Sequence, residues 1–339
     1  MQQIQWYSWL NFSYRQIIKQ YYMKRSYPVI LFHAPPGLGI KNLIWNISSW
    51  LMCFFSTGLK SCGICQSCNL MKMNNHPDLV TINSCSSIGI DIIRLIYNKI
   101  YQRSQLGKSK IIWIAEANKL TEEASNALLK TLEEPPDNTY FFLYSYNLSG
   151  ISAILRSRCQ DWQISPPRES EGIQWIKINF HNRSCLTDNN IIAALRICSW
   201  APLAAIKLLQ SNYWTYRAKI AVWIIDILND QKDILEILPF FNHDNVQNQI
   251  EVFCTLFIDA IKLQYDKNVF IINYDVPNLL HQLSKLSGKI LHESLKSWLI
   301  LQHYFTHVKS ANRKLLLIDQ LLNWQQLIKS SNKRKKICF

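Results

Sequence analysis

The sequence lacks any long hydrophobic run. No apolar stretch reaches the roughly 18 residues that a membrane-spanning helix needs. The segment Met1 to Arg25 carries Gln, Tyr and Lys where a secretory signal would have an apolar core. Internal repeats and low-complexity inserts are missing as well. These absences predict a soluble cytoplasmic protein without a membrane partner.

Acidic residues are scarce. The chain has 23 Asp and Glu against 37 Lys and Arg, which gives a formal net charge of +14. Residues 1–110 hold twelve basic and two acidic side chains, whereas residues 168–332 are nearly balanced, with seventeen basic and fourteen acidic ones. Two explanations of the excess stay open. Codon drift toward A and T enriches Lys together with Ile and Asn, and a DNA-facing surface concentrates charge on one face.

The chain is long enough for more than one hydrophobic core. It has 339 residues, of which 48% are hydrophobic and 18% charged. This composition excludes a disordered chain and a small disulfide-stabilised domain. We expect two or three domains.

The first half alternates short apolar runs with helical periods. Four runs are expected to be strands: Val29 to Phe32, Leu79 to Ile82, Ile111 to Ala115 and Tyr140 to Tyr144. Apolar residues at helical spacing follow the first run from Leu43 to Phe54, and Thr121 is a candidate helix N-cap after the third run. The pattern predicts an α/β domain over residues 1–167, with a parallel sheet wrapped by helices.

Beyond Pro166-Pro167 the pattern changes to helices alone. Strand-like segments nearly vanish from Ile173 onward. We expect a small helical domain over 168–211 and an all-α domain over 212–332, with helices near 215–229, 246–265, 287–305 and 311–328. The basic residues 333–339 are expected to form a disordered tail.

Four of the ten cysteines are close together in the sequence. A C-x8-C-x2-C-x2-C pattern contains Cys53, Cys62, Cys65 and Cys68, and the other six cysteines are scattered singly. Gly63 permits a tight turn, and four thiolates suit a tetrahedral ion, so a structural zinc module over residues 53–68 is favoured. A redox cysteine pair and an iron–sulfur cluster remain alternatives. His76 is a spare candidate ligand, which we interpret as a turn residue.

An incomplete phosphate-binding loop follows the first expected strand. In the complete pattern G-x-x-x-x-G-K-[ST], the Lys binds the β- and γ-phosphates and the hydroxyl binds Mg²⁺. Here Ala34 replaces the first Gly, Gly37 and Gly39 are kept, Ile40 replaces the Lys, and Lys41 stands at the hydroxyl position. Successive helical residues point about 100° apart, so Lys41 does not substitute for the missing Lys.

The third expected strand lacks the acidic residue that would hold magnesium. It ends at Ala115, followed by Glu116 alone. Without both the Lys and the Asp, the electrostatic conditions for phosphoryl transfer are missing. We therefore expect no bound ATP and no hydrolysis, although Lys41 leaves weak phosphate binding open.

Several motifs together resemble one family. They are the string Asn126-Ala-Leu-Leu-Lys-Thr-Leu-Glu-Glu-Pro-Pro136, the triplet Ser157-Arg158-Cys159, the four-cysteine insert and His76-Pro77-Asp78. In combination they are similar to the bacterial clamp-loader AAA+ family. The resemblance covers about residues 29–165 specifically and the rest by helical layout. The degenerate loop points to the family member that has lost ATP hydrolysis.

The resemblance implies a subunit of a hetero-oligomer, the clamp loader of DNA polymerase III. Its implied partners are the ATP-hydrolysing loader subunits, the delta subunit and, through the complex, the sliding clamp and primer-template DNA. Residues 168–211 would form a lid, and residues 212–332 a collar for oligomerisation. Trp200-Ala201-Pro202-Leu203 stands where hydrolysing members carry a nucleotide-sensing Arg, and it contains none.

The resemblance also implies that Arg158 reaches into the ATP site of a neighbouring subunit. A permanently charged, forked guanidinium suits the charge that develops on a γ-phosphate. The alternative for Arg158 is an ion pair with an acidic group on its own surface. Ser157 and Cys159 are expected to pack and to shape the turn, because the sequence shows no base that would activate Cys159.

Three functions remain to be distinguished at this point. The first is a non-hydrolysing clamp-loader subunit that donates Arg158. The second is an active AAA+ ATPase with an irregular loop. The third is a zinc-containing DNA-binding module unrelated to clamp loading.

Overall fold

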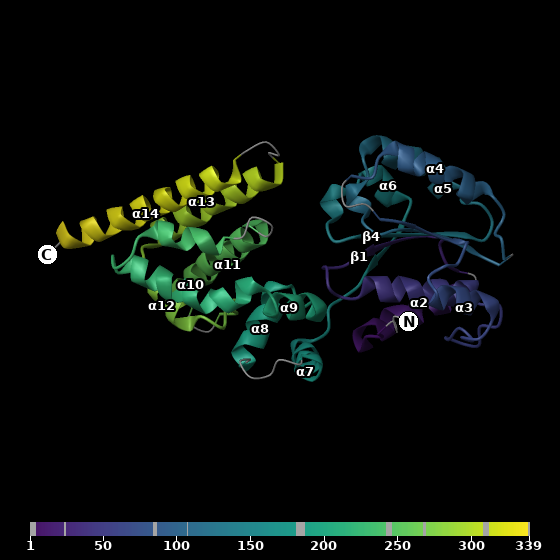
Figure 1. The fold of residues 1–339 in the computed structure, drawn as a ribbon, viewed down its shortest axis with the longest axis horizontal. Helices are drawn as coiled ribbons and strands as arrows, with labels where there is room; N and C mark the ends of the chain where they lie inside the picture. The colour runs from purple at the N-terminus through teal and green to yellow at the C-terminus, as the bar shows by residue number, and fades with distance from the viewer. Residues whose placement is uncertain are drawn as a thin grey trace. The chain divides into compact units, whose positions relative to one another are not determined.

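The chain forms two compact units, Met1–Pro167 and Arg168–Phe339 (Figure 1). The computed structural model describes residues 5–23, 25–83, 87–106, 108–180, 187–241, 246–266, 269–307 and 312–337. Cys85, Cys185 and Cys338 lie outside these ranges. The boundary between the units falls where strand-like segments end in the sequence.

The first unit contains a five-stranded, all-parallel sheet. In spatial order the strands are β2 (Leu79–Ile82), β3 (Lys110–Ile114), β4 (Thr139–Ser145), β1 (Val29–His33) and β5 (Gln160–Gln163). The expected parallel sheet is confirmed. Strand β5 was not predicted, because it has the polar sequence Gln-Asp-Trp-Gln and pairs only with β1 at the sheet edge.

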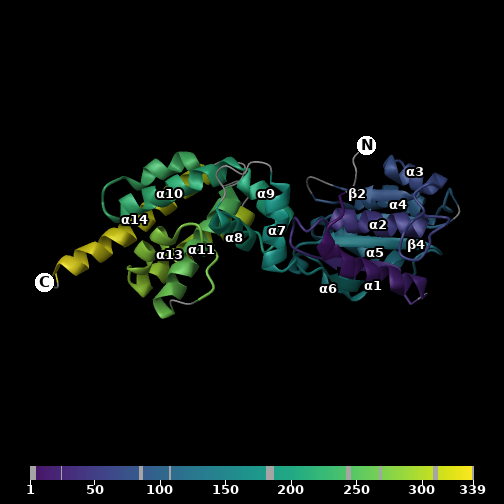
Figure 2. The same ribbon diagram turned by 90° about the horizontal axis from the view of Figure 1, so that it is seen from below.

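Helices cover both faces of this sheet (Figure 1). One face carries α1 (Asn11–Tyr22), α2 (Ile40–Met52) and α3 (Gln66–Lys72), and the other carries α4 (Ile90–Tyr101), α5 (Glu122–Glu133) and α6 (Ala153–Ser157). Figure 2 views the unit from the side of α1 and α2, which contact each other. Alternate strand residues such as Leu31, Ile112 and Phe141 enter the core beneath α4 and α5. The central strands β3, β4 and β1 are therefore mostly buried on both faces, as expected for a parallel sheet, whereas the edge strands β2 and β5 keep exposed residues.

Short 3-10 turns and side-chain caps at helix starts complete this unit. The turns are η1 (Ser8–Leu10), η2 (Ala117–Lys119) and η3 (Leu148–Gly150). The predicted N-cap of α5 is present, since the Thr121 hydroxyl accepts a hydrogen bond from the Ala124 N–H at 3.2 Å. Pro135 and Pro136 directly follow the end of α5 and prevent its continuation. The cap and the prolines thus fix where Glu133, the last residue of α5, is placed.

The described part of the second unit is all helical and contains two hydrophobic cores. A small core lies among α7 (Glu169–Asn179), α8 (Asp188–Ile197) and α9 (Pro202–Leu209). A larger core, centred on the fully buried Trp298 and Trp324, joins α10 (Asn212–Leu228), η5 (Ile234–Phe240), α11 (Val246–Tyr265), α12 (Pro277–Ser284), α13 (Gly288–His307) and α14 (Arg313–Ile337). The four long helices lie where helical periods were expected. Helix α12 was not predicted, although Leu279, Leu280 and Leu283 recur at helical spacing and are buried in this core.

The C-terminal end differs from the expectation. Residues 333–337 continue α14, whereas we expected a disordered tail over 333–339. Lys and Arg are good helix formers, and positive charges near a helix C-terminus interact favourably with its dipole. A basic run at this position is therefore compatible with helix. Residues 338–339 lie outside the described ranges.

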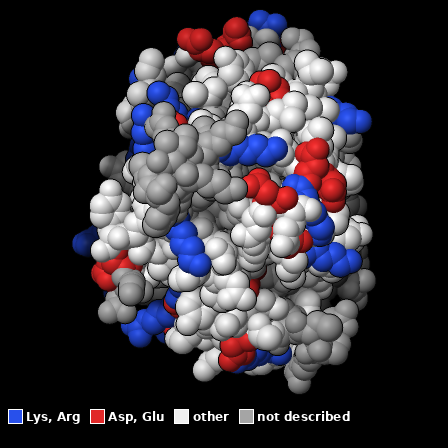
Figure 3. All heavy atoms as spheres, turned by 90° about the vertical axis from the view of Figure 1, so that its left-hand side faces the viewer, with Lys and Arg blue, Asp and Glu red and all other residues white. Residues whose placement is uncertain are grey.

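The surface of the second unit carries charges of both signs. In the space-filling view of Figure 3, Lys and Arg side chains are interspersed with Asp and Glu. This mixture agrees with the near balance of charges over residues 168–332.

Among the described residues no single helix is long and apolar enough to cross a membrane. Helices α8 and α9 reach the necessary length and hydrophobicity only when they are taken together, and this pair is bent by 119°.

Candidate functional site

The glycine loop joins β1 to α2 and contains two glycines in the left-handed region. Gly37 and Gly39 have φ angles of +92° and +81°, a left-handed region that glycine adopts without strain. Gly39 is also the N-cap of α2. Ile40, at the position of the phosphate-binding Lys, is only 5% exposed, whereas Lys41 is exposed to solvent. The loop thus keeps its two glycines, while a buried apolar side chain stands at the position of the cation.

The segment that precedes α1 covers this loop. The Tyr7 ring is so close to Gly39 that a Cβ atom built on the glycine would lie 2.5 Å from Tyr7 Cδ2 and Cε2. The Trp9 indole N–H donates a hydrogen bond to the Leu38 carbonyl at 2.9 Å. Tyr7 and Trp9 stack with 5.0 Å between ring centroids, and Tyr7 is only 6% exposed. Part of the chain itself therefore occupies the space beside the loop.

Asn42 in the first turn of α2 fixes the same segment. Its side-chain amide donates to the Gln5 carbonyl at 2.6 Å. Burial raises the pKa of the Tyr7 phenol, and a side-chain hydrogen bond with Asn42 opposes this shift. Tyr7 is therefore neutral near pH 7 and packs as an aromatic side chain rather than as a charge.

A double-mutant cycle tests the contact between Tyr7 and Gly39. We expect Gly39→Ala to lower the free energy of unfolding by about 2–4 kcal/mol, because a Cβ atom adds backbone strain and a clash with the ring. In a Tyr7→Ala background the same substitution should cost at least about 1 kcal/mol less, since only the backbone strain remains. Urea unfolding of the four proteins measures the difference.

Gly58 provides the matched control for this cycle. It also has a positive φ, +56°, but a Cβ atom there would meet nothing within 4 Å. Gly58→Ala should therefore cost the same with or without Tyr7. Additive costs for Gly39→Ala and Tyr7→Ala would contradict the proposed packing.

The end of β3 carries no carboxylate suited to magnesium. Ala115 directly follows the strand, and the Glu116 carboxylate forms an ion pair with Lys119. The Glu116 side chain is 38% exposed. Its local partner and its exposure support the expectation that it does not replace the missing Asp.

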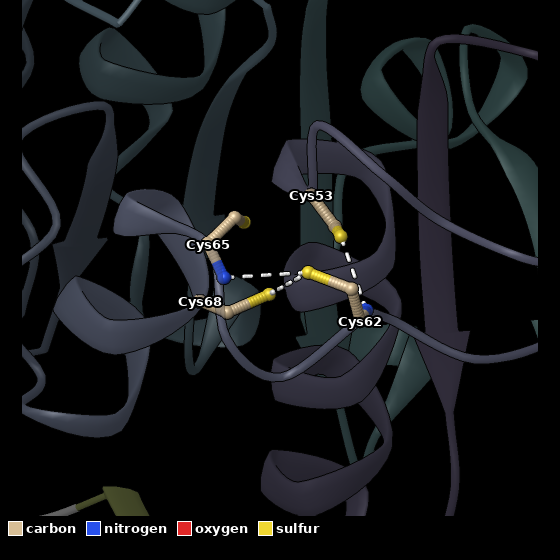
Figure 4. A group of neighbouring side chains, drawn as sticks. All are labelled: Cys53, Cys62, Cys65 and Cys68. Carbon is tan, nitrogen blue, oxygen red and sulfur yellow. Dashed lines mark hydrogen bonds between the residues drawn. The ribbon is translucent and has the colours of Figure 1, made fainter.

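Four cysteine thiols converge between the end of α2 and α3 (Figure 4). The Sγ atoms of Cys53, Cys62, Cys65 and Cys68 lie within 4.8 Å of one another, and all four thiols are free. Tetrahedral zinc with Zn–S bonds of about 2.3 Å places its sulfur atoms roughly 3.8 Å apart. The distance between Cys62 Sγ and Cys68 Sγ is 3.9 Å. This donor set can hold a four-coordinate metal ion.

Backbone N–H groups stabilise negative charge on some of these sulfur atoms. The Cys62 N–H donates to Cys53 Sγ at 3.2 Å, and the Cys65 N–H donates to Cys62 Sγ at 3.4 Å. Hydrogen bonds from the backbone of Ile64 and Cys65 lower the pKa of the Cys62 thiol to about 6. Burial instead raises the pKa of Cys53, and that of Cys68 to about 12. A bound cation would favour the thiolate form of all four, because metal binding displaces thiol protons.

His76 connects the cysteine segment to the sheet domain rather than joining the metal ligands. Its Nε2 lies 3.0 Å from the Ser67 hydroxyl, and its Nδ1 accepts a hydrogen bond from the Asp78 N–H at 3.2 Å. The buried Asp78 carboxylate in turn accepts from the N–H groups of Gln105 and Leu106 at 2.7 and 3.1 Å. The His-Pro-Asp motif therefore anchors the chain between α3 and β2.

Arg158 is the C-cap of α6 and pairs with Glu133 at the end of α5. Its Nε and Nη2 both contact Glu133 Oε1. Its Nη1 donates to the Ile154 carbonyl at 3.0 Å and to the Ser157 hydroxyl at 3.3 Å. The sequence analysis gave an ion pair with an acidic group on the same subunit as the alternative for Arg158, and the structure contains such a pair. The Arg158 side chain is 30% exposed and that of Glu133 is 47% exposed, and such pairs contribute only about 0–1 kcal/mol. A stronger anion can therefore replace Glu133.

The neighbours of Arg158 have packing and turn roles. The Ser157 hydroxyl donates to the Ile154 carbonyl at 2.8 Å. The Cys159 thiol donates to the Leu155 carbonyl at 3.2 Å, and burial raises its pKa to about 12. A thiol with this pKa is protonated at pH 7, which supports the interpretation that Cys159 is not a nucleophile.

Comparison with known proteins gives matches over nearly the whole chain. Family models described as "DNA polymerase III, delta subunit" and "DNA polymerase III, delta subunit, C terminal" match residues 11–168 and 211–326. The DNA polymerase III subunit delta′ of Yersinia pestis is 38% identical over 325 residues, which cover 94% of this chain and 95% of that protein. The delta′ subunit of Escherichia coli (strain K12) is 32% identical over 323 residues, with 94% and 95% coverage. The chain belongs to the DNA polymerase III delta′ family.

Membership of the delta′ family confirms the resemblance seen in the sequence motifs. The DNA polymerase III subunit tau/gamma of Haemophilus influenzae is also similar, but less so: it is 27% identical over 167 residues, which cover 49% of this chain and 23% of that protein. The similarity to delta′ proteins therefore extends over about twice as much of this chain as the similarity to that tau/gamma subunit.

A second arginine of this delta′ family member is held within the second unit. In the stretch Trp200 to Leu203, Trp200 has a φ of +59° and stacks on Phe270 at 5.7 Å. Arg196, at the end of α8, donates from Nε to Glu169 Oε1 at 2.8 Å and from Nη1 to the Ile271 carbonyl. Its guanidinium also lies 4.3 Å from the centre of the Phe270 ring. These contacts engage Arg196 within the second unit.

Sequence reasoning missed two features of the delta′ site. One is the cover of the glycine loop by Tyr7 and Trp9, for which the aromatic string Trp6-Tyr7-Ser8-Trp9 was the available signal. The other is Glu133 as the partner of Arg158, although Glu133 belongs to a motif that was recognised. Both contacts join segments that are far apart in the sequence, and no local spacing predicts them.

Proposed function

We propose that this chain is the delta′ subunit of a bacterial clamp loader, which helps to load the sliding clamp onto primed DNA and does not hydrolyse ATP itself. The observation that carries the proposal is the glycine loop: it has Ile40 in place of Lys and is covered by Tyr7 and Trp9. An ATP phosphate would have to displace the buried Tyr7 ring and would find no Lys at the usual position. The hypothesis of an active ATPase lacks this chemical basis.

Arg158 is the proposed contribution of this subunit to ATP hydrolysis by its neighbour. Its side chain is partly exposed and permanently charged, and the only anion among its described partners is the exposed Glu133 carboxylate. A guanidinium supplied from a second polypeptide stabilises the charge that forms on a transferring γ-phosphoryl group. Arg158, in the Ser157-Arg158-Cys159 motif, therefore has the charge and the partial exposure that binding to a neighbouring subunit's γ-phosphate requires.

The proposed partners follow from the delta′ relatives and their names. They are the ATP-hydrolysing tau/gamma-type subunits, a delta subunit and, through the assembled loader, the sliding clamp and primer-template DNA in the cytoplasm. Within this chain, we assign residues 168–211 to a lid and residues 212–332 to a collar. The separate hydrophobic cores of these two segments support that division.

Zinc is the metal that we propose for the four-cysteine site. Four free thiols within 4.8 Å of one another match a closed structural site, which usually holds zinc. When bound, the ion would crosslink the end of α2 to α3 and would leave no open coordination position for catalysis.

Reconstitution tests the proposed function directly. The chain should copurify with the tau/gamma-type and delta subunits, and the complex should show DNA-stimulated ATPase activity. The isolated chain should neither hydrolyse ATP nor bind it with a micromolar dissociation constant in the presence of magnesium. Tight ATP binding would favour the active-ATPase hypothesis. Failure to join the loader, together with DNA binding by the chain alone, would favour an unrelated DNA-binding module.

A further inference from the structure

The Arg158 guanidinium is almost fully engaged by its own subunit. An arginine side chain has five N–H donors. Nε and one Nη2 hydrogen are directed to Glu133 Oε1, and the two Nη1 hydrogens serve the Ile154 carbonyl and the Ser157 hydroxyl. One Nη2 hydrogen remains for an outside group. The guanidinium therefore cannot present its fork to a phosphate without releasing at least one of these partners.

Glu133 is the partner that an incoming phosphate would replace. It is the only anion among the described partners of Arg158, and its side chain is 47% exposed. The Ile154 carbonyl and the Ser157 hydroxyl belong to the same short helix as Arg158 and move with it. Glu133 is held from a different helix, whose ends are fixed by the Thr121 cap and by Pro135.

We propose that Glu133 is a positioning residue, whose carboxylate binds the Arg158 guanidinium until the γ-phosphate of the neighbouring subunit's ATP replaces it. Its carboxylate keeps the guanidinium charge paired and ordered while no phosphate is present. The phosphate then takes over the Nε and Nη2 donors when the ATP site closes. This inference rests on the proposed finger role of Arg158.

The expected effect of removing this carboxylate is small and has a defined direction. Because an exposed Arg–carboxylate pair contributes about 0–1 kcal/mol, Glu133→Gln should accelerate hydrolysis at the site served by Arg158 by up to about fivefold without clamp and DNA. The total rate of a loader with several sites should rise about twofold. The rate with clamp and DNA should change little, because Arg158 has then already left Glu133.

The experiment compares complexes isolated at full stoichiometry, each containing one variant of this chain. Glu134→Gln is the matched control, since Glu134 is the next residue, is also acidic and exposed, and forms none of the ion pairs found in the described part of the chain. Glu133→Gln combined with Arg158→Ala is the second control. ATPase rates are measured with and without clamp and primed DNA.

The proposal is supported if only Glu133→Gln raises the unstimulated rate and if the rise disappears in the Arg158→Ala background. A lower rate in Glu133→Gln would overturn it, because Glu133 would then be a scaffold for the active arginine. An equal rise in Glu134→Gln would also overturn it, since net charge would explain both. If Arg158→Ala lowers the stimulated rate while Glu133→Gln has no effect, the finger role stands and the positioning role of Glu133 is rejected. If Arg158→Ala has no effect, the finger role itself fails, and the inference fails with it.

Discussion

Arg158→Ala should greatly reduce the DNA- and clamp-stimulated ATPase activity of the assembled loader, while this subunit remains folded. The expected loss is up to about 10³-fold at the ATP site that Arg158 serves, as for other arginines supplied by a second chain, and smaller in the total rate if other sites keep their own arginines. The side chain is partly exposed and its ion pair with Glu133 contributes little to stability, so folding and assembly should persist. Steady-state ATPase assays on stoichiometric complexes provide the measurement.

Two further variants make this result specific. Arg158→Lys should restore little activity, because an ammonium keeps the charge but not the planar fork. Arg156→Ala is the matched control: Arg156 lies in the same helix and pairs with Asp161 at 2.7 Å, and its loss should leave the ATPase rate unchanged. A normal rate for Arg158→Ala, with only a small change in the melting temperature of this chain, would instead assign Arg158 to its own surface ion pair.

Removal of the metal should cause the largest structural effect. We expect about one equivalent of tightly bound zinc per chain, and Cys65→Ser should reduce this to less than half an equivalent because it removes one of four thiolate ligands. The segment from Cys53 to Cys68 should then become sensitive to proteases. The rest of the protein should stay folded, so its helix and strand signals in circular dichroism should be nearly unchanged. Metal analysis and limited proteolysis measure the two effects.

A cysteine outside the cluster controls for general thiol chemistry. Cys198 lies in the second unit, and burial raises its pKa to about 12. Because Cys198 is not one of the four clustered cysteines, the Cys198→Ser variant should bind as much zinc as the unmodified protein. Iron in the purified protein, or a full equivalent of zinc in Cys65→Ser, would contradict the proposed ligand set.

The buried parts of the fold were predictable because their local patterns and their burial agree. The strands β1, β3 and β4 are apolar runs that are buried on both faces of the sheet, and the mainly apolar β2 is partly buried, so their composition revealed them. Strand β5 escaped prediction because the edge of the sheet tolerates the polar sequence from Gln160 to Gln163. Helix α14 extended beyond its expected end because a basic run suits a helix C-terminus as well as it suits a disordered tail.

The candidate site was predictable only where a single segment carries it. The spacing of the four cysteines and the missing Lys at Ile40 are visible in the sequence, and the structure brings the four cysteine sulfur atoms together. The packing of Tyr7 on Gly39 and the pairing of Glu133 with Arg158 each join two segments through the tertiary fold. No periodicity or motif specifies which side chains meet in this way.

The most direct test of the central claim is a structure of the assembled loader with clamp, primed DNA and a non-hydrolysable ATP analogue. The account predicts that Arg158 has left Glu133 and that its guanidinium nitrogens lie about 2.7–3.2 Å from the γ-phosphate oxygens of the neighbouring subunit's nucleotide, and that this chain's own glycine loop remains covered by Tyr7 and Trp9. If Arg158 is still paired with Glu133 while the γ-phosphate is bound by other groups, or if nucleotide occupies the glycine loop of this chain, the account is contradicted.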